Sequence, residues 1–160
     1  MVDYKTYIDQ GIDYIHQGKY QEAINFITQS IDLKDDWEIS YFYRAVAHQA
    51  LGNLDEAMLD YSKSIQINPK MTDAYYNKAY IALTRKDIDN PSIEKAIKDL
   101  EKAIELDPKF VDALYAMAAA QKKIGDYHKA LEYLETLLQI EPNAVNAKAL
   151  KKLILQKYII

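Results

Sequence analysis

Positions 18–23 read Gly18-Lys19-Tyr20-Gln21-Glu22-Ala23, and both the glycine and the alanine recur 34 residues later, as Gly52 and Ala57. Towards the other end of the chain, Pro108 and Pro142 are also 34 residues apart. A fixed period of this length is typical of stacked helix-turn-helix repeats, in which every copy is one supersecondary unit. The sequence therefore predicts an all-α repeat protein.

The period divides the chain into four copies and a final segment. One interval is longer, because Ala57 and Ala96 are 39 residues apart, and the third copy therefore carries five extra residues. Each copy reads as two helices, since apolar residues follow helical spacing until a glycine or a proline interrupts them. The predicted copies are 4–37, 38–71, 72–110 and 111–144, followed by a capping helix at 145–160, all within a single domain, 1–160.

Local signals refine some helix boundaries. In the second copy, Asn53 is the expected N-cap of the second helix, and Glu56 three residues later completes a capping box. This helix should stop at Asn68-Pro69, because proline cannot continue a helix and disfavours it in the preceding residue. The third copy has no glycine in the stretch 84–92, which holds the extra residues. There Asn90-Pro91 is expected to be an N-cap followed by proline at the first helical position.

The repeated residues closely resemble the tetratricopeptide repeat family. That family uses a large residue, a small one four positions on and another large one three further on, and Tyr7, Gly11 and Tyr14 supply all three. Its turn motif matches positions 18–23 and again Gly125-Asp126-Tyr127-His128-Lys129-Ala130. The resemblance implies a right-handed α-solenoid of four repeats plus a C-terminal capping helix. The copies should stack, because one helix pair cannot bury its apolar face alone.

Composition argues against several classes of function. Lys and Arg number 20 and Asp and Glu 24, a net charge of −4 without a basic block, so a nucleic-acid partner is not expected. The absence of cysteine excludes disulfides and thiolate metal sites, and it favours a cytoplasmic location. No apolar run approaches the ~20 residues that a membrane span requires.

Nothing in the sequence points to catalysis, a metal or a cofactor. The three histidines, His16, His48 and His128, fall at different repeat positions, and none is paired with a nucleophile at a motif spacing. The four glycines are not clustered into a phosphate loop. Asp87 and Asp89 lie in the inserted stretch but lack the rest of a calcium-loop pattern, so we read that stretch as a solvated loop.

The resemblance also implies where a ligand would bind. In related proteins the first helix of each pair lines a concave groove, and transfer of those positions gives a mostly aromatic and aliphatic surface. Such rings are favoured anchors in protein interfaces, and Asn77 stands where relatives often bond the backbone of a bound peptide. The predicted peptide-binding residues are Ile8, Ile12, Phe42, Tyr43, Val46, Tyr76, Asn77, Tyr80 and Tyr115.

These residues favour a non-catalytic adaptor that binds an apolar or amphipathic segment of another protein. The best-known family mode grips the terminal carboxylate of a chaperone with Lys, Asn and Arg side chains. The matching positions here include Ile12, Tyr43 and Asp73 and carry no cation, so that mode is disfavoured.

The final segment suggests a second hypothesis. Its stripe of Leu150, Leu153, Ile154 and Tyr158 should cover the fourth copy. Leu155 and Ile159 point towards the polar side, with Ile160 after them, and these three residues suit self-association into a homodimer. The alternative function is thus a self-associating assembly module that uses its C-terminal helix. A basic amphipathic membrane anchor is a weaker third option.

Overall fold

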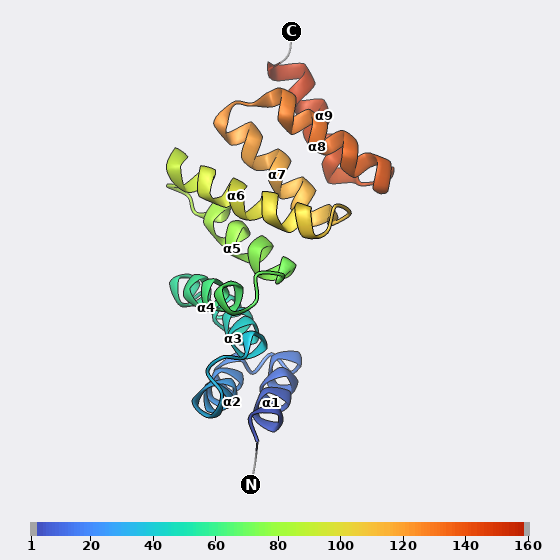
Figure 1. The fold of residues 1–160 in the computed structure, drawn as a ribbon. Helices are drawn as coiled ribbons and strands as arrows, with labels where there is room; N and C mark the ends of the chain where they lie inside the picture. Colours follow the sequence, from blue (N-terminus) through green and yellow to red (C-terminus); the bar gives the residue numbers. More distant parts are fainter. Residues whose placement is uncertain (1–2, 159–160) are drawn as a thin grey trace. The chain divides into compact units, whose positions relative to one another are not determined.

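The computed structural model of the protein describes residues 3–158, and within this range it contains nine α-helices and no strand (Figure 1). This confirms the all-α helical repeat fold predicted from the period. The helices are α1 (Tyr4–His16), α2 (Tyr20–Leu33), α3 (Glu38–Ala50), α4 (Leu54–Ile67), α5 (Thr72–Thr84), α6 (Asn90–Leu106), α7 (Val111–Ile124), α8 (Tyr127–Ile140) and α9 (Val145–Tyr158).

The helices divide into two compact units, residues 1–74 and 75–160. Unit 1 holds α1 to α4, where α1 packs against α2, α2 against α3 and α3 against α4. Unit 2 holds most of α5 and all of α6 to α9, where α6 packs against α7, α7 against α8 and α8 against α9. The single domain predicted from the sequence stays a prediction.

The glycines that set the period have a conformational role in the turns. Gly18, Gly52 and Gly125 have φ angles of 72°, 81° and 87°, in the left-handed region that glycine adopts without a steric penalty. Gly11 is different, because it lies within α1, where an added Cβ would overlap Ile27 of α2. It therefore permits the close approach of the two helices that the repeat requires.

Of the two predicted N-caps, Asn53 is confirmed as the N-cap residue of α4, whereas Asn90 is wrong. Asn53 precedes α4 but makes no side-chain capping hydrogen bond, so the expected capping box does not form. In the third copy the cap is Asp89, one residue earlier than predicted, and its Oδ1 accepts a 2.9 Å hydrogen bond from the Ser92 backbone N–H. The capped helix α6 has 17 residues where α4 has 14, so three of the five extra residues lengthen this helix and the rest lengthen the loop before it.

The cores of both units combine large aliphatic side chains with alanines. The buried apolar residues of unit 1 include Ile8, Ile24, Ile27, Ile31, Tyr41 and Tyr61 with Ala23, Ala45, Ala47 and Ala57, and those of unit 2 include Leu100, Met117 and Leu134 with four alanines of α7 (Ala113, Ala116, Ala118 and Ala120). Small side chains let neighbouring helices pack closely at α7. Of the five buried polar residues in the described range, Ser30, Ser40, Asp60 and Ser64 belong to unit 1, and Gln121 belongs to unit 2.

Across residues 3–158, no helix combines the length and the apolar character needed to cross a membrane.

Candidate functional site

The predicted binding residues of unit 1 form a half-buried aromatic surface on α3. Phe42 and Tyr43 meet edge to face with their ring centroids 5.3 Å apart, and Phe42 also lies 5.7 Å from the buried ring of Tyr61. Ile12 and Val46 are likewise half-buried. Packing within unit 1 therefore accounts for much of this surface.

Ile8 does not belong to an accessible surface. Only 1% of its surface is exposed, and it packs with Ile27 and Tyr41 in the core of unit 1. Ile8 occupies the same repeat position as Phe42 and Tyr76. Its shorter side chain is covered by the core, whereas a longer ring at this position remains partly exposed. We therefore leave Ile8 out of the candidate site.

Unit 2 brings three aromatic rings together at α5 and the start of α7. The ring centroid of Tyr76 lies 6.0 Å from that of Tyr80, one turn along α5, and 5.0 Å from that of Phe110, the N-cap residue of α7. Tyr76 is half-buried and Tyr80 is 45% exposed. We call Tyr76, Tyr80 and Phe110 the Tyr76 patch. Only the third copy has a ring at the repeat positions of both Tyr76 and Tyr80, because the residues equivalent to Tyr80 in the other copies are Ile12, Val46 and Ala119.

The other two predicted residues of unit 2 lie on the same helices. Asn77 is half-buried on α5, next to Tyr76. Tyr115 is half-buried on α7 and packs with the core cluster of Leu114 and Leu134 rather than with the Tyr76 patch. The structure therefore brings Tyr76 and Tyr80 together and places Tyr115 with a different cluster.

A carboxylate lies within electrostatic reach of the Tyr76 patch. Burial raises the pKa of Tyr76 above its ordinary value, and the negative charge of Asp112 and the neighbouring Tyr80 raise it further. Asp112 is exposed in the first turn of α7, where the helix dipole stabilises its charge. The site therefore combines aromatic rings with the negative charge of Asp112.

Phe110 was not identified from the sequence. Its signal is its place just after Pro108, which ends the preceding helix, and just before the first residue of α7.

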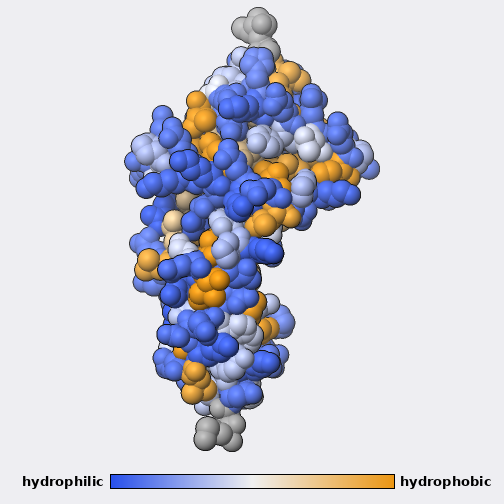
Figure 2. All heavy atoms as spheres, viewed as in Figure 1, coloured by the Kyte–Doolittle hydropathy of each residue, from blue (hydrophilic) through white to orange (hydrophobic). Residues whose placement is uncertain are grey.

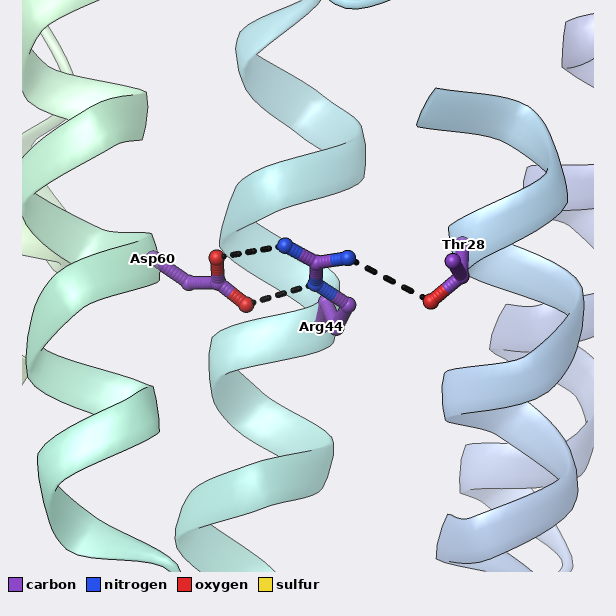
Figure 3. A network of polar contacts seen from close by, with 3 residues as sticks. All are labelled: Thr28, Arg44 and Asp60. Atoms are coloured by element: carbon purple, nitrogen blue, oxygen red, sulfur yellow. Dashed lines mark hydrogen bonds and ion pairs between the residues drawn. The ribbon is translucent and has the colours of Figure 1, made fainter. Parts of the chain in front are cut away.

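A polar network that the sequence reasoning also missed joins three helices of unit 1. Arg44 of α3 donates from Nε to Asp60 Oδ2 at 2.7 Å and from Nη2 to Asp60 Oδ1 at 2.9 Å, and its Nη1 donates to Thr28 Oγ1 at 3.3 Å (Figure 3). The ion pair is largely buried, with side-chain exposures of 21% for Arg44 and 10% for Asp60. It links α2, α3 and α4, so we assign it a structural role.

Unit 2 has an ion pair at the equivalent repeat positions. Lys78 Nζ lies 3.1 Å from Asp99 Oδ2, and these residues follow Arg44 and Asp60 by 34 and 39 positions. Those are the two intervals of the repeat itself, so comparison of the copies position by position is the signal that would have found both pairs.

The last helix is only partly described by the predicted stripe. Ile154 is buried and Leu150 half-buried, as expected, and Tyr158 stacks on Tyr127 at 4.4 Å. Leu153 is 43% exposed, however, so its assignment to the covered side is wrong. Leu155 is also 43% exposed, and Ile159 and Ile160 lie outside the described residues.

Other surface features of the described residues differ from the Tyr76 patch. Figure 2 shows apolar side chains in separate groups on a largely hydrophilic face. An open pocket of about 320 Å³ is formed by four consecutive residues of the turn before α9, Glu141 to Ala144, without an aromatic ring. Within the described part of the chain, no group of three or more His, Cys, Asp and Glu residues is arranged to hold a metal ion.

The fold and this surface define a helical repeat protein with partly exposed rings on the first helices of its pairs. Three family descriptions match: residues 39–71 the tetratricopeptide repeat, residues 92–125 the TPR repeat, and residues 111–159 the Fis1 C-terminal tetratricopeptide repeat. Together they span more than half of the chain. The protein belongs to the tetratricopeptide repeat family.

Curated relatives match parts of the chain. Hsp70-Hsp90 organizing protein 2 of Arabidopsis thaliana is 27% identical over 82 residues, which is 51% of this chain and 14% of that protein. Mitochondrial import receptor subunit TOM70 of Homo sapiens is 33% identical over 76 residues, which is 44% of this chain and 12% of that protein. The aligned region thus spans about an eighth of the length of these relatives.

Solved structures share the fold over more of its length. A crystal structure of MamA protein has a TM-score of 0.87 at 20% identity and covers 96% of this chain and 81% of that one. The first TPR of Spaghetti (RPAP3), bound to the HSP90 peptide SRMEEVD, has a TM-score of 0.70 at 24% identity and covers 76% of this chain and 93% of that one. At these identities the likeness shows the fold alone.

Proposed function

We propose that the protein is a non-catalytic, cytoplasmic adaptor or scaffold that holds an apolar or amphipathic segment of another protein against the exposed rings of its first helices. The observation that carries this proposal is the Tyr76–Tyr80 pair. Tyr80 is 45% exposed and lies 6.0 Å from Tyr76. An interior position would account for a ring such as Tyr61, which is fully buried, but not for Tyr80.

Rings of this kind suit recognition of a protein segment. Tyrosine offers a large and rigid contact area at a low entropic cost, and central aromatic anchors carry much of the binding energy of protein interfaces. Asn77 follows Tyr76 on α5, and its amide has both a donor and an acceptor for the backbone of the bound segment. We expect an affinity in the micromolar range, roughly −8 kcal/mol.

The relatives support this class of function. The Arabidopsis and human relatives are an Hsp70-Hsp90 organizing protein and an import receptor subunit, and the Spaghetti structure holds a peptide. That peptide ends in EEVD, in which three of the four residues are acidic. The positions that match the two lysines and the arginine of that clamp here hold Ile8, Asp73 and Asn77 and carry no positive charge, so we propose a segment of different chemistry.

The test is affinity capture from an extract of the native source by four forms of the chain. These are the wild type, Tyr76→Ala/Tyr80→Ala, Phe42→Ala/Tyr43→Ala, and the control Tyr158→Ala on α9, where Tyr158 is 37% exposed. We expect that the wild type and the control retain a partner protein and that the Tyr76→Ala/Tyr80→Ala variant loses it. The far-ultraviolet circular dichroism of this variant should equal that of the wild type, which shows that the variant is folded. Equal capture by all four forms would contradict the proposal.

Self-association remains a second candidate because Leu153 and Leu155 expose 43% each on α9. Sedimentation velocity of the wild type and of Leu155→Glu tests it. A dimer that dissociates in the variant would support the assembly function, and a wild-type monomer would exclude it at the concentration measured.

A further inference from the structure

We propose that the segment bound at unit 2 presents an arginine or lysine side chain, which lies over the rings of Tyr76 and Tyr80 with its charge directed at Asp112. This inference rests on the proposed function, because it names the chemistry of the segment that the adaptor holds.

The rings of the Tyr76 patch have the right spacing for a cation. The face of an aromatic ring attracts a positive charge that lies within about 6 Å of its centroid. The centroids of Tyr76 and Tyr80 are 6.0 Å apart, with the ring planes inclined by 36°. At this spacing one planar guanidinium can contact both tyrosines. The ring centroid of Phe110 lies 5.0 Å from that of Tyr76 and supports this ring.

Four other tyrosines of the chain, Tyr4, Tyr14, Tyr41 and Tyr158, have an internal cation over the ring. The charged groups lie 5.0–6.0 Å from the ring centroids in five pairs: Lys34 over Tyr4, Lys19 over Tyr14, Arg44 and Lys63 over Tyr41, and Lys157 over Tyr158. Among residues 3–158, no lysine or arginine lies over Tyr76 or Tyr80. The rings of half-buried Tyr76 and exposed Tyr80 thus differ from these four rings in having no internal cation.

Asp112 supplies the complementary charge. It is exposed, and its negative charge helps to raise the pKa of Tyr76. It forms no ion pair within the described part of the chain. Lys78 of α5 does not serve it, since its Nζ is held 3.1 Å from Asp99. A cation from outside the chain would therefore meet the rings of Tyr76 and Tyr80 and the carboxylate of Asp112.

The other kinds of segment fit this site less well. An acidic segment would be repelled by Asp112. A purely apolar segment would cover the carboxylate without giving it a partner, and burial of an unpaired charge is costly. An amphipathic segment with one arginine or lysine satisfies the rings and the carboxylate together.

The probes that test this inference are two fluorescein-labelled amphipathic peptides composed of leucine, alanine and arginine, in one of which citrulline replaces every arginine. Citrulline keeps the shape of the side chain and removes its charge. By fluorescence anisotropy we expect the arginine peptide to bind about tenfold more tightly, since a partly desolvated cation–π contact with an adjacent carboxylate is worth a factor of this order.

Variants of the protein assign the effect. Asp112→Asn should weaken the arginine peptide by about three- to tenfold and leave the citrulline peptide unchanged. The matched control Glu101→Gln removes an exposed charge from α6 and should change neither. If the two peptides bind wild type equally, if the arginine peptide does not bind, or if Asp112→Asn has no effect, the inference is wrong.

The same measurements separate this inference from the proposed function. If both peptides bind equally and Tyr76→Ala/Tyr80→Ala weakens both, the tyrosines remain a binding surface and only the cation is excluded. If binding of both peptides survives that double substitution, the surface itself is wrong.

Discussion

Units 1 and 2 contain an ion pair at the same repeat positions but with different chemistry. In unit 1, the guanidinium of Arg44 binds both oxygens of Asp60 at 2.7 and 2.9 Å. In unit 2, the ammonium of Lys78 makes one 3.1 Å contact with Asp99. A planar guanidinium matches a carboxylate with two parallel hydrogen bonds, whereas an ammonium acts as a point charge. The repeat therefore fixes where a charge pair lies, and not how strongly it is held.

Protonation behaviour follows the same difference. The hydrogen bonds with Asp60 raise the pKa of Arg44, although burial opposes them. Burial also raises the pKa of Asp99 above its ordinary 3.8, and the Lys78 contact only partly opposes it. The charge of Asp99 is therefore incompletely compensated by Lys78.

Neighbouring positions extend this contrast between the units. Ser30 Oγ donates to the Tyr4 carbonyl oxygen at 2.8 Å, and Ser64 Oγ, one repeat later, donates to the Glu38 carbonyl oxygen at 3.0 Å. The equivalent residue of unit 2 is the buried Ala103. Unit 1 thus fixes its helices at this repeat position with directional polar contacts, which the buried apolar side chains of Ala103 and, one repeat later, Leu137 cannot make.

The largest effect is expected from breaking the stronger pair. Arg44→Met leaves Asp60, which is 7% exposed, without its partner. Loss of one partner of a fully buried pair costs about 3–5 kcal/mol, and because Arg44 keeps some exposure we expect about 2–4 kcal/mol here. The single tryptophan, Trp37, lies in unit 1 against Tyr4, so denaturation followed by its fluorescence reports on this unit. The variant Arg44→Met/Asp60→Leu should recover most of the loss, and a single variant as stable as wild type would contradict the structural role.

The matched change in unit 2 should cost less. Lys78→Met removes one contact from Asp99, whose pKa is already raised, and we expect a loss of about 1–2 kcal/mol in denaturation followed by circular dichroism. Because the pKa of Asp99 is higher in the folded state than its value near 3.8 in the unfolded state, protonation of Asp99 stabilises the fold. This stabilisation is fully present below about pH 3.8 and is lost as the pH rises through the pKa of the folded state. The cost of Lys78→Met should therefore shrink as the pH falls towards 4. A cost equal to that of Arg44→Met would remove the distinction between the pairs.

Exchange of the two cations sharpens the comparison. Arg44→Lys keeps the charge but loses one of the two parallel hydrogen bonds, and we expect a loss of about 1 kcal/mol. Lys78→Arg offers Asp99 a second hydrogen bond and should be neutral or stabilise unit 2 by up to about 0.5–1 kcal/mol. Carboxyl-carbon NMR should show a lower pKa for Asp99 in Lys78→Arg. An unchanged or higher pKa would mean that guanidinium geometry is not what distinguishes the pairs.

The smallest effect is the acid response of unit 1. Burial lowers the pKa of His48 below 6.5, with Arg44 acting in the same direction and Asp60 and Glu56 in the opposite one. Because the pKa of His48 is lower in the folded state, neutral His48 contributes stability that is present above pH 6.5 and is lost as the pH falls through the folded-state pKa. The denaturation midpoint reported by Trp37 fluorescence should therefore decrease as the pH is lowered from about 7 to about 5. His48→Gln should flatten this change, and an unaltered slope would assign it to other groups.

The period was sufficient to predict the fold, because it depends on residues whose role is local. Glycines with a left-handed backbone end the first helices of three pairs, and Asn68-Pro69 ends α4, whose last residue is Ile67. The caps could not be predicted as well, because Asn53 has the right residue type yet does not make the hydrogen bond.

The candidate site was predictable in part. Repeat position and family resemblance pointed to Tyr76 and Tyr80, but the depth of a side chain depends on its length and its neighbours. Ile8 is buried at the same repeat position where Tyr76 is half-exposed. The support of Tyr76 by Phe110 comes from packing between α5 and the start of α7, a tertiary contact that no local signal specifies.

The most direct test of the central claim, that the Tyr76 patch holds another protein, is site-specific photocrosslinking in cells of the native source. A photoreactive phenylalanine analogue replaces Tyr80 in one variant and Tyr158 in the control, and the products are identified by mass spectrometry. We predict a crosslinked product at position 80 that contains a different protein and is absent at position 158. The same products at both positions, or at position 80 only a product of two copies of this chain, would contradict the claim.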